Sequence, residues 1–419
     1  MAKILLVNIG LHGHVNPTLG LAGELVAQGH ELRFLATEEF AESIERTGAR
    51  FVSYPSVVGR RTAETAQQQA LAAARGEAPP AQASGMARFC EEFVATLPAL
   101  RREIAAYAPD LVIYDLVAVA AKIVADHFGI PTVQFFTTYA SNEHYDLMRE
   151  SFAKHDSPAR GRLDAWRAPL TRALEEQGLS GAAMSLSGVT PPANLVFMPR
   201  GFQPRGETFD QRFRFCGPCF ARQPENAAVP FLPPGDGPLM VVCLGSVFHE
   251  WPEFFRDCIA AFKDTRWRVV MGIGSRIDPR ALGPIPSNFT VAAQIPQVPL
   301  LAHADLFVGH GGMNSTMESL AHGVPLVVIP QIEEQAITAA RVAAMQLGVS
   351  LKRQEVDAAA LAAACAQVHQ SSIMKANAVA FQREIEASGG AAAAAAYALS
   401  FVRTASVSAD RVDRHSTRR

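Results

Sequence analysis

The sequence predicts an α/β fold of two domains, each built on a parallel β-sheet. The chain has 419 residues, enough for two or three domains of ordinary size. Short apolar runs alternate with helical patterns along most of it, which is typical of βα units. Between residues 217 and 238 this alternation stops and prolines and glycines accumulate, which indicates a linker between two domains.

The first half begins with an apolar strand over residues 4–10. The next helix is expected to begin at Asn16, with Pro17 in its first turn, and to end at Gly29. A long helix is predicted over residues 86–107, and residues 141–180 are helical but less regular. Further strands are predicted over residues 31–37, 50–54, 110–115, 132–137, 194–199 and 212–215.

The second half repeats the pattern with strands over residues 239–245, 267–272, 289–293, 306–309, 326–330 and 349–352. The predicted division is a first domain over 1–216, a linker over 217–238 and a second domain over 239–385. An alanine-rich helix over 386–402 follows. Residues 403–419 carry Arg, Asp, Ser and Thr without apolar spacing, which predicts a disordered tail.

Composition excludes several classes of protein. Hydrophobic residues make up 49% and charged residues 19%, as in globular proteins. Thirty-eight basic and forty acidic residues leave a net charge of −2, which disfavours a nucleic-acid binder. No apolar run reaches about 20 residues, and the first one is too short for a signal peptide. With six cysteines in so long a chain, we expect a reduced, cytoplasmic protein.

One segment occurs twice in similar form. Residues 12–19 and residues 310–317 share His, Gly, Asn and Thr at the same offsets, and each segment follows an apolar strand and begins a helix. Ligands of open α/β sheets bind at the carboxyl ends of the strands. The repeat therefore predicts a cleft between the domains, with His12 on one wall and His310 on the other.

The stretch 294–335 concentrates polar residues suited to a sugar nucleotide. Gly311 and Gly312 allow close backbone approach, and Asn314 with Ser315 stands at a helix N-terminus, where phosphate oxygens bind. His310 can donate to the same oxygens. One turn later Glu318 suits neutral hydroxyls such as a ribose diol, and Glu334 with Gln335 offers acceptors and a donor to sugar hydroxyls.

This segment resembles the donor-binding signature of nucleotide-sugar glycosyltransferases of the two-domain GT-B fold, which include UDP-glycosyltransferases and bacterial macrolide glycosyltransferases. The resemblance covers most of the chain and implies two Rossmann-like domains, with the acceptor bound by the first and the nucleotide sugar by the second. It also implies that the last helix returns to the first domain. By the resemblance, Gln297 meets the nucleoside, Glu318 the ribose, His310 with Asn314 and Ser315 the diphosphate, and Glu334 with Gln335 the sugar. Gly312 is a further donor-binding position of the family.

Three further donor contacts are less settled. The family often has a Trp before the Pro-Gln pair, stacked on the base, whereas this chain has Gln294. The choice between UDP and dTDP donors therefore stays open. Ser246, in the loop after the first strand of the second domain, is a candidate for the β-phosphate, and a simple turn is the alternative. Thr137 and Thr138 end a first-domain strand and are candidates for contact with the donor sugar.

His12 and Asp115 are the predicted catalytic pair. Both follow strands of the first domain and should reach the same edge of its sheet. A carboxylate bonded to one ring nitrogen raises the basicity of the other, which suits removal of a proton from an acceptor hydroxyl. The family's catalytic dyad lies at these positions by the resemblance. His14 is the competing base, and a capping histidine with a structural aspartate is the alternative for the pair.

Three other patterns in the sequence do not favour additional chemistry. Residues 10–15 lack the third glycine of a NAD-binding fingerprint. The C-x-x-C of Cys216 and Cys219 runs into the linker instead of beginning a helix, which disfavours redox chemistry. No Asp-x-Asp pair and no second cysteine pair occurs, so no metal or cofactor is expected.

The sequence thus predicts an inverting, metal-independent glycosyltransferase that carries a sugar, with UDP-glucose favoured as donor, to a hydroxyl of a hydrophobic small molecule. A polyketide, macrolide or flavonoid acceptor is favoured because aromatic residues could line an apolar pocket, namely Phe135, Phe136, Tyr139, Phe152 and Trp166. The alternatives are a dTDP-deoxysugar transferase, a nucleotide-sugar epimerase and a non-catalytic sugar-nucleotide-binding protein. The oligomeric state is not predicted.

Overall fold

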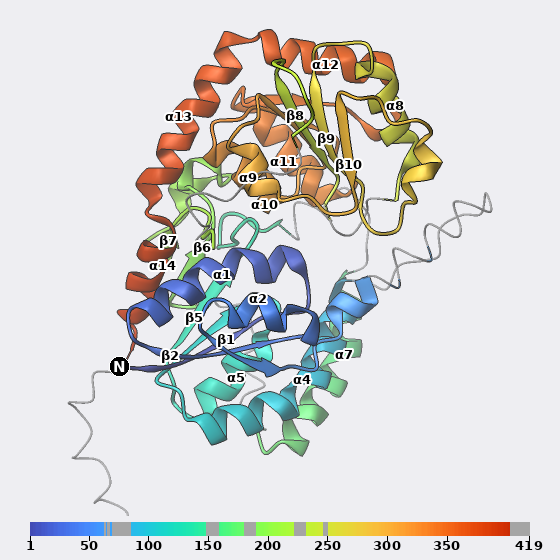
Figure 1. The fold of residues 1–419 in the computed structure, drawn as a ribbon. Coiled ribbons are helices and arrows are strands. Elements are labelled where there is room, and N and C mark those ends of the chain that lie inside the picture. The colour runs from blue at the N-terminus through green and yellow to red at the C-terminus, as the bar shows by residue number, and fades with distance from the viewer. Residues whose placement is uncertain are drawn as a thin grey trace, which may run out of the picture.

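The computed structural model confirms the predicted α/β class and shows two domains stacked on each other (Figure 1). It describes residues 1–62, 64, 68, 85–147, 159–179, 190–221, 232–245 and 250–402. The predicted tail over 403–419 and much of the predicted linker lie outside these residues. In the part of the chain that is described, no helix is long and apolar enough to cross a membrane.

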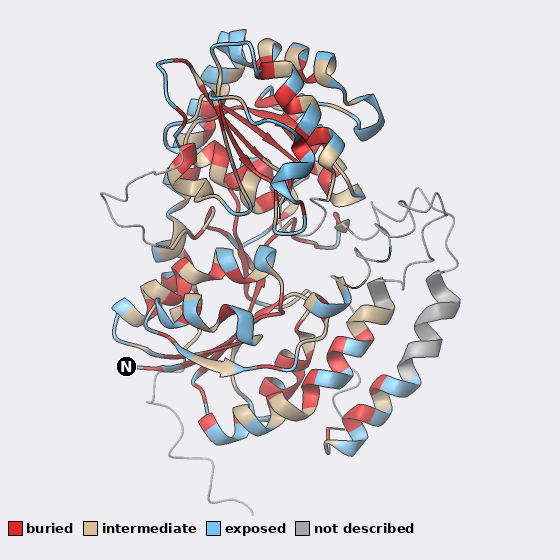
Figure 2. Cartoon of the chain, turned by 45° about the vertical axis from the view of Figure 1, so that its right-hand side comes forward, coloured by how far each residue is buried: buried red, intermediate tan, exposed pale blue. Residues whose placement is uncertain are grey.

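The N-terminal domain has a seven-stranded parallel sheet in the order β3-β2-β1-β4-β5-β6-β7. Strands β1 and β4 are buried almost throughout, because helices cover both faces of the sheet (Figure 2). The strands are β1 (Lys3–Val7), β2 (Glu31–Ala36), β3 (Arg50–Ser53), β4 (Leu111–Asp115), β5 (Thr132–Phe136), β6 (Asn194–Val196) and β7 (Phe213–Phe215). The helices are α1 (His12–Ala27), α2 (Ala41–Glu45), α4 (Gly85–Tyr107), α5 (Val119–His127) and α7 (Ala159–Glu176).

The C-terminal domain repeats this plan with a six-stranded parallel sheet in the order β10-β9-β8-β11-β12-β13. Its strands are β8 (Leu239–Cys243), β9 (Arg268–Gly272), β10 (Phe289–Ala292), β11 (Leu306–Gly309), β12 (Leu326–Val328) and β13 (Gly348–Ser350). Its helices are α8 (Pro252–Phe262), α9 (Gln297–Leu301), α10 (Met313–Ala321), α11 (Glu333–Ala344), α12 (Ala358–Gln370) and α13 (Ser372–Ser388).

In both sheets the chain reverses its direction of strand addition once. The reversal lies between β1 and β4 in the first sheet and between β8 and β11 in the second. Loops that leave the carboxyl ends of such neighbouring strands diverge and open a crevice for ligands. His14 lies in the first turn of α1, which follows β1, and Asp115 is the last residue of β4. The loops after β8 and β11 carry Gly245 and His310.

The last two helices connect the domains. Helix α13 runs along both domains, and α14 (Gly390–Leu399) packs on α1 of the N-terminal domain (Figure 1). Ala394, Ala395 and Ala398 of α14 are fully buried in the core that α1 shares. Their small side chains let the helix lie close to its neighbour. Tyr397 of the same helix donates a hydrogen bond of 2.9 Å to the Arg212 carbonyl.

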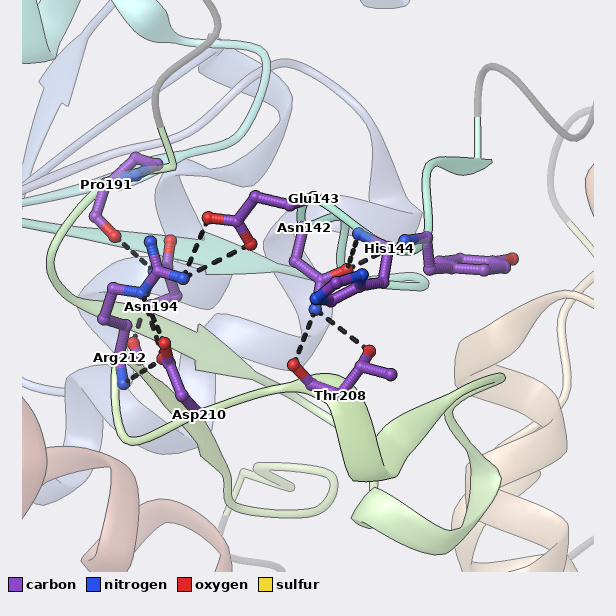
Figure 3. A network of polar contacts seen from close by, with 9 residues as sticks. Asn142, Glu143, His144, Pro191, Asn194, Thr208, Asp210 and Arg212 are labelled. Carbon is purple, nitrogen blue, oxygen red and sulfur yellow. Dashed lines mark hydrogen bonds and ion pairs between the residues drawn. The ribbon is translucent and has the colours of Figure 1, made fainter.

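A loop network holds the segment that follows β5. Asn142 donates to the Thr208 carbonyl at 3.0 Å, and its own side-chain oxygen accepts from the His144 and Tyr145 amides (Figure 3). Arg212 bonds both Asp210 and Glu143. These contacts fix the end of the 137–145 segment, whose beginning faces the C-terminal domain.

Candidate active site

Asp115 and His14 form a hydrogen-bonded pair at the reversal point of the first sheet. Because β1 and β4 are neighbours in register, the residues that follow β1 pass over the end of β4. Asp115 is fully buried, and its Oδ2 lies 2.6 Å from His14 Nδ1. Its Oδ1 accepts from the Val117 amide at 2.8 Å, so both carboxylate oxygens are oriented. The His14 side chain keeps 20% of its surface exposed, which leaves it accessible for chemistry.

The predicted pairing of His12 with Asp115 is wrong. His12 is exposed, and its ring packs edge-on against Phe40 with ring centroids 4.8 Å apart. The cause is the start of α1, which begins at His12 and not at Asn16 as the cap pattern predicted. Residues two apart on a helix point about 200° apart, so only one of the two histidines can face Asp115.

The environment of His14 raises its pKa. Burial acts to lower the pKa, but the charge of Asp115, the hydrogen bond with it and the charge of Glu334 together outweigh burial. Thr137 Oγ1 lies 3.4 Å from the same Nδ1. Thr137 therefore stands beside the histidine in the first domain.

His310 occupies a narrow slot in the second domain. A Cβ added at Gly312 would lie 2.4 Å from its Nε2, and one added at Gly245 would lie 2.6 Å from its Cε1. Burial lowers the pKa of His310 to about 4, so the ring is neutral at physiological pH. A neutral imidazole can donate one N–H to an anion but brings no positive charge.

Gln297, Ser315 and Glu318, three of the predicted donor-binding residues, lie together in one hydrogen-bonded group. The Gln297 amide donates to Ser315 Oγ at 3.0 Å and to Glu318 Oε2 at 2.5 Å. Burial raises the pKa of Glu318 to about 7, and the Gln297 bond opposes that rise only in part. Gln294, by contrast, is exposed.

Asn314 bonds across the cleft to the first domain. Its Nδ2 donates to the Gly13 carbonyl at 2.8 Å. In a regular helix this carbonyl would accept from residue 17, but Pro17 has no N–H. The proline of α1 therefore leaves an acceptor at the cleft, and the second domain uses it.

Glu334 makes a second bridge between the domains. Thr138 donates to its Oε1 at 2.7 Å, and one turn along α11 Thr338 accepts from the Tyr139 hydroxyl at 3.3 Å. Gln335 is buried, and its side-chain oxygen accepts from the Gln331 amide. Glu334 thus lies at the domain interface, close enough to His14 to act on it by charge.

The remaining predicted residues either lie outside the described part of the chain or belong to the core. Ser246 and Phe152 lie outside the described residues, as does the side chain of Trp166. The prediction that Phe135, Phe136 and Tyr139 line an acceptor pocket is wrong, because they are buried in the core. Phe135 stacks on Phe197 and Tyr139 on Phe202, with ring centroids 5.6 and 6.2 Å apart.

Sequence reasoning missed Glu92, which holds the loop before His14. Its buried carboxylate accepts from Ser56 Oγ and from the Val57 and Val58 amides. Ser56 Oγ in turn accepts from the Gly10 amide at 3.2 Å. Nothing in the helical sequence around Glu92 distinguishes it from the exposed Glu91, so only the packing identifies it.

Comparisons with known proteins agree with the geometry of this site. Residues 260–395 match the family model described as "Erythromycin biosynthesis protein CIII-like, C-terminal domain". The chain is 36% identical to the NDP-glycosyltransferase YjiC of Bacillus subtilis over 404 residues, covering 96% of this chain and 98% of that protein. It is 35% identical to the demethyllactenocin mycarosyltransferase of Streptomyces fradiae, covering 94% and 85%.

Among solved structures, the calicheamicin glycosyltransferase CalG4 superposes with a TM-score of 0.81 at 33% identity, covering 97% of this chain and 99% of that one. The fold and the site therefore define a glycosyltransferase of the GT-B class. Within that class, the chain belongs to the macrolide-type UDP-glycosyltransferase family of natural-product enzymes.

Proposed function

We propose that this glycosyltransferase transfers a sugar from a nucleoside diphosphate to a hydroxyl of a hydrophobic small molecule, with inversion and without metal. The observation that carries the proposal is the position of the His14–Asp115 pair. It faces the second domain at the point where Asn314 and Glu334 meet the first. UDP-glucose is the favoured donor, and a dTDP-sugar is the alternative. The alternative is kept because Gln294 supplies no aromatic ring for the base.

His14 acts as the general base in this proposal. Its Nδ1–H donates to Asp115, which leaves the lone pair of Nε2 free for the acceptor's hydroxyl proton. The acceptor oxygen then attacks the anomeric carbon from the face opposite the leaving group. The new C–O bond forms as the bond to the diphosphate breaks, and the configuration inverts.

The leaving diphosphate is stabilised by dipoles and N–H donors. Helix α10 begins at Met313, so its first amides and its positive end meet the developing negative charge. Neutral His310 contributes one N–H. These groups supply the stabilisation that a divalent ion would otherwise provide.

A mass-spectrometric transfer assay with EDTA present tests the proposal. UDP-glucose and dTDP-glucose are each offered with a panel of phenolic and macrolide acceptors. The expected product gains one hexose with inverted configuration by NMR. Loss of transfer on chelation and recovery with magnesium would refute the metal-independent mechanism. Free or epimerised sugar formed without an acceptor would favour the epimerase alternative, and nucleotide binding without turnover the binding protein.

A further inference from the structure

A cavity of about 260 Å³ lies between the domains, and neither His14 nor Asp115 is among its lining residues. Its lining comes from α1 of the first domain, from α9 and α10 of the second, and from residues 218–221 of the connecting chain. This volume is slightly below the range of about 300–1,000 Å³ of small-molecule pockets. The cavity can therefore take one part of a larger ligand.

The lining of this cavity combines polar and apolar groups. Its polar side chains are Glu318 and Asn314 of the second domain and Asn16 of the first. Most of the remaining lining is apolar, including Phe220 and Pro218 from the connecting chain and Pro17 and Phe197 from the first domain. Glu318 is acidic and no described lining residue is basic, which disfavours a phosphate here. A flat, largely apolar ring attached to a hydroxylated sugar fits this mixture.

The backbone at Phe220 lies against the first domain. A Cβ added at Gly20 of α1 would lie 2.4 Å from the carbonyl oxygens of Cys219 and Phe220, so the connecting chain rests directly on that helix. The Cys216 carbonyl accepts from the Gly390 amide at 2.7 Å, which anchors the start of the same segment. A side chain on an anchored backbone loses less entropy when its ring stacks on a ligand.

From these observations we infer that the cavity is the nucleoside pocket and that Phe220 is the residue against which the nucleobase packs. The inference rests on the proposed function and on the ribose contact that the resemblance implies for Glu318. It supplies the aromatic contact that exposed Gln294 cannot make. It also places a determinant of donor specificity in the chain between the domains.

The first test measures UDP and dTDP affinity by calorimetry, together with the KM for the donor, in Phe220→Ala. Loss of an aromatic–base stack weakens binding by about 5- to 100-fold. We expect that loss for both nucleotides, a matching rise in KM and an unchanged kcat. Gln294→Ala is the matched control and should bind as wild type. Equal affinities of Phe220→Ala and wild type would overturn the inference.

A second variant separates ligand contact from damage to the fold. Phe220→Trp places an indole in the cavity, and a stacked base should quench its fluorescence in step with the binding measured by calorimetry. Wild type, whose three tryptophans are Trp166, Trp251 and Trp267, should show no such quenching. Binding without quenching in the variant would overturn the inference alone. Wild type that binds neither nucleotide would overturn the proposed function, and the inference with it.

Discussion

The two similar segments of this protein, residues 12–19 and 310–317, use their first histidine in opposite ways. His12 is exposed against Phe40, whereas the partly buried His310 ring is confined between glycines. The difference lies two residues further along. Position 312 is glycine, and its missing Cβ makes room for the His310 ring, but the equivalent position 14 carries a side chain that reaches Asp115.

The two segments also differ in where their helix begins. Helix α1 begins at His12, the first residue of its segment, whereas α10 begins at Met313, the fourth residue of its own. In the first domain the histidines therefore belong to the helix and offer a proton acceptor. In the second domain the histidine precedes the helix, and free amides face the cleft. Under the proposed function, one sequence pattern thus supplies the base on one wall and the diphosphate site on the other.

The largest expected effect separates His14 from His12. His14→Ala should lower kcat by about 10²- to 10⁴-fold, the usual contribution of a general base, with UDP affinity retained. His12→Ala should stay within a few-fold of wild type, because its ring only packs on Phe40. Steady-state kinetics and calorimetry on both variants measure this. The reverse ranking would restore His12 as the base.

Removing the charge of Asp115 should change both rate and pH dependence. Wild-type kcat/KM is expected to fall as the pH drops through the raised pKa of His14, since the protonated ring cannot accept a proton. Asp115→Asn should move this acidic limb to lower pH and reduce the maximum rate at least about tenfold. A pH–rate profile of each protein tests this. An acidic limb at the same pH in both would mean that a group other than His14 titrates.

The free energy of unfolding of wild type should also depend on the protonation of His14. It should fall as the pH rises, whereas kcat/KM falls as the pH drops. A raised histidine pKa stabilises the fold while the ring is protonated. This contribution is complete below about pH 6.5 and is lost as the pH rises through the native pKa. Denaturant unfolding at a series of pH values should lose this component in Asp115→Asn.

One glycine from each of the two segments should differ in how well it tolerates a side chain. Gly312→Ala forces the His310 ring from its slot and should cost about 1–3 kcal/mol of unfolding free energy along with donor affinity. Gly13→Ala meets its nearest atom, Asn314 Nδ2, at 3.9 Å and should be neutral or slightly stabilising. Chemical denaturation with UDP titration compares them. Equal stability of the two variants would show that His310 is not confined.

The smallest expected effect concerns Pro17. Pro17→Ala restores an amide that competes with Asn314 for the Gly13 carbonyl, so the contact between domains weakens. We expect a rise in donor KM of about two- to fivefold, near the effect of one neutral hydrogen bond. Pro169→Ala, at an exposed proline inside α7, is the matched control. A KM unchanged in both variants would exclude a role for the Asn314 bond in donor binding.

The sequence by itself determined the two parallel-sheet domains, because buried βα units leave a strong apolar alternation. The sequence also predicts which polar residues gather in the second-domain loops. The reason is that glycines, a helix start and polar side chains follow one another within a few positions there. Asp115 could be placed for the same reason, as the residue that ends a buried strand.

Only the tertiary structure decided which histidine meets Asp115 and which aromatics are core. The start of α1 differs by four residues from the cap pattern, and that shift turns His12 away and His14 inward. The bond from Asn314 to Gly13 joins residues 301 positions apart. Such pairings depend on how two sheets and a connecting chain pack, and local sequence carries no record of them.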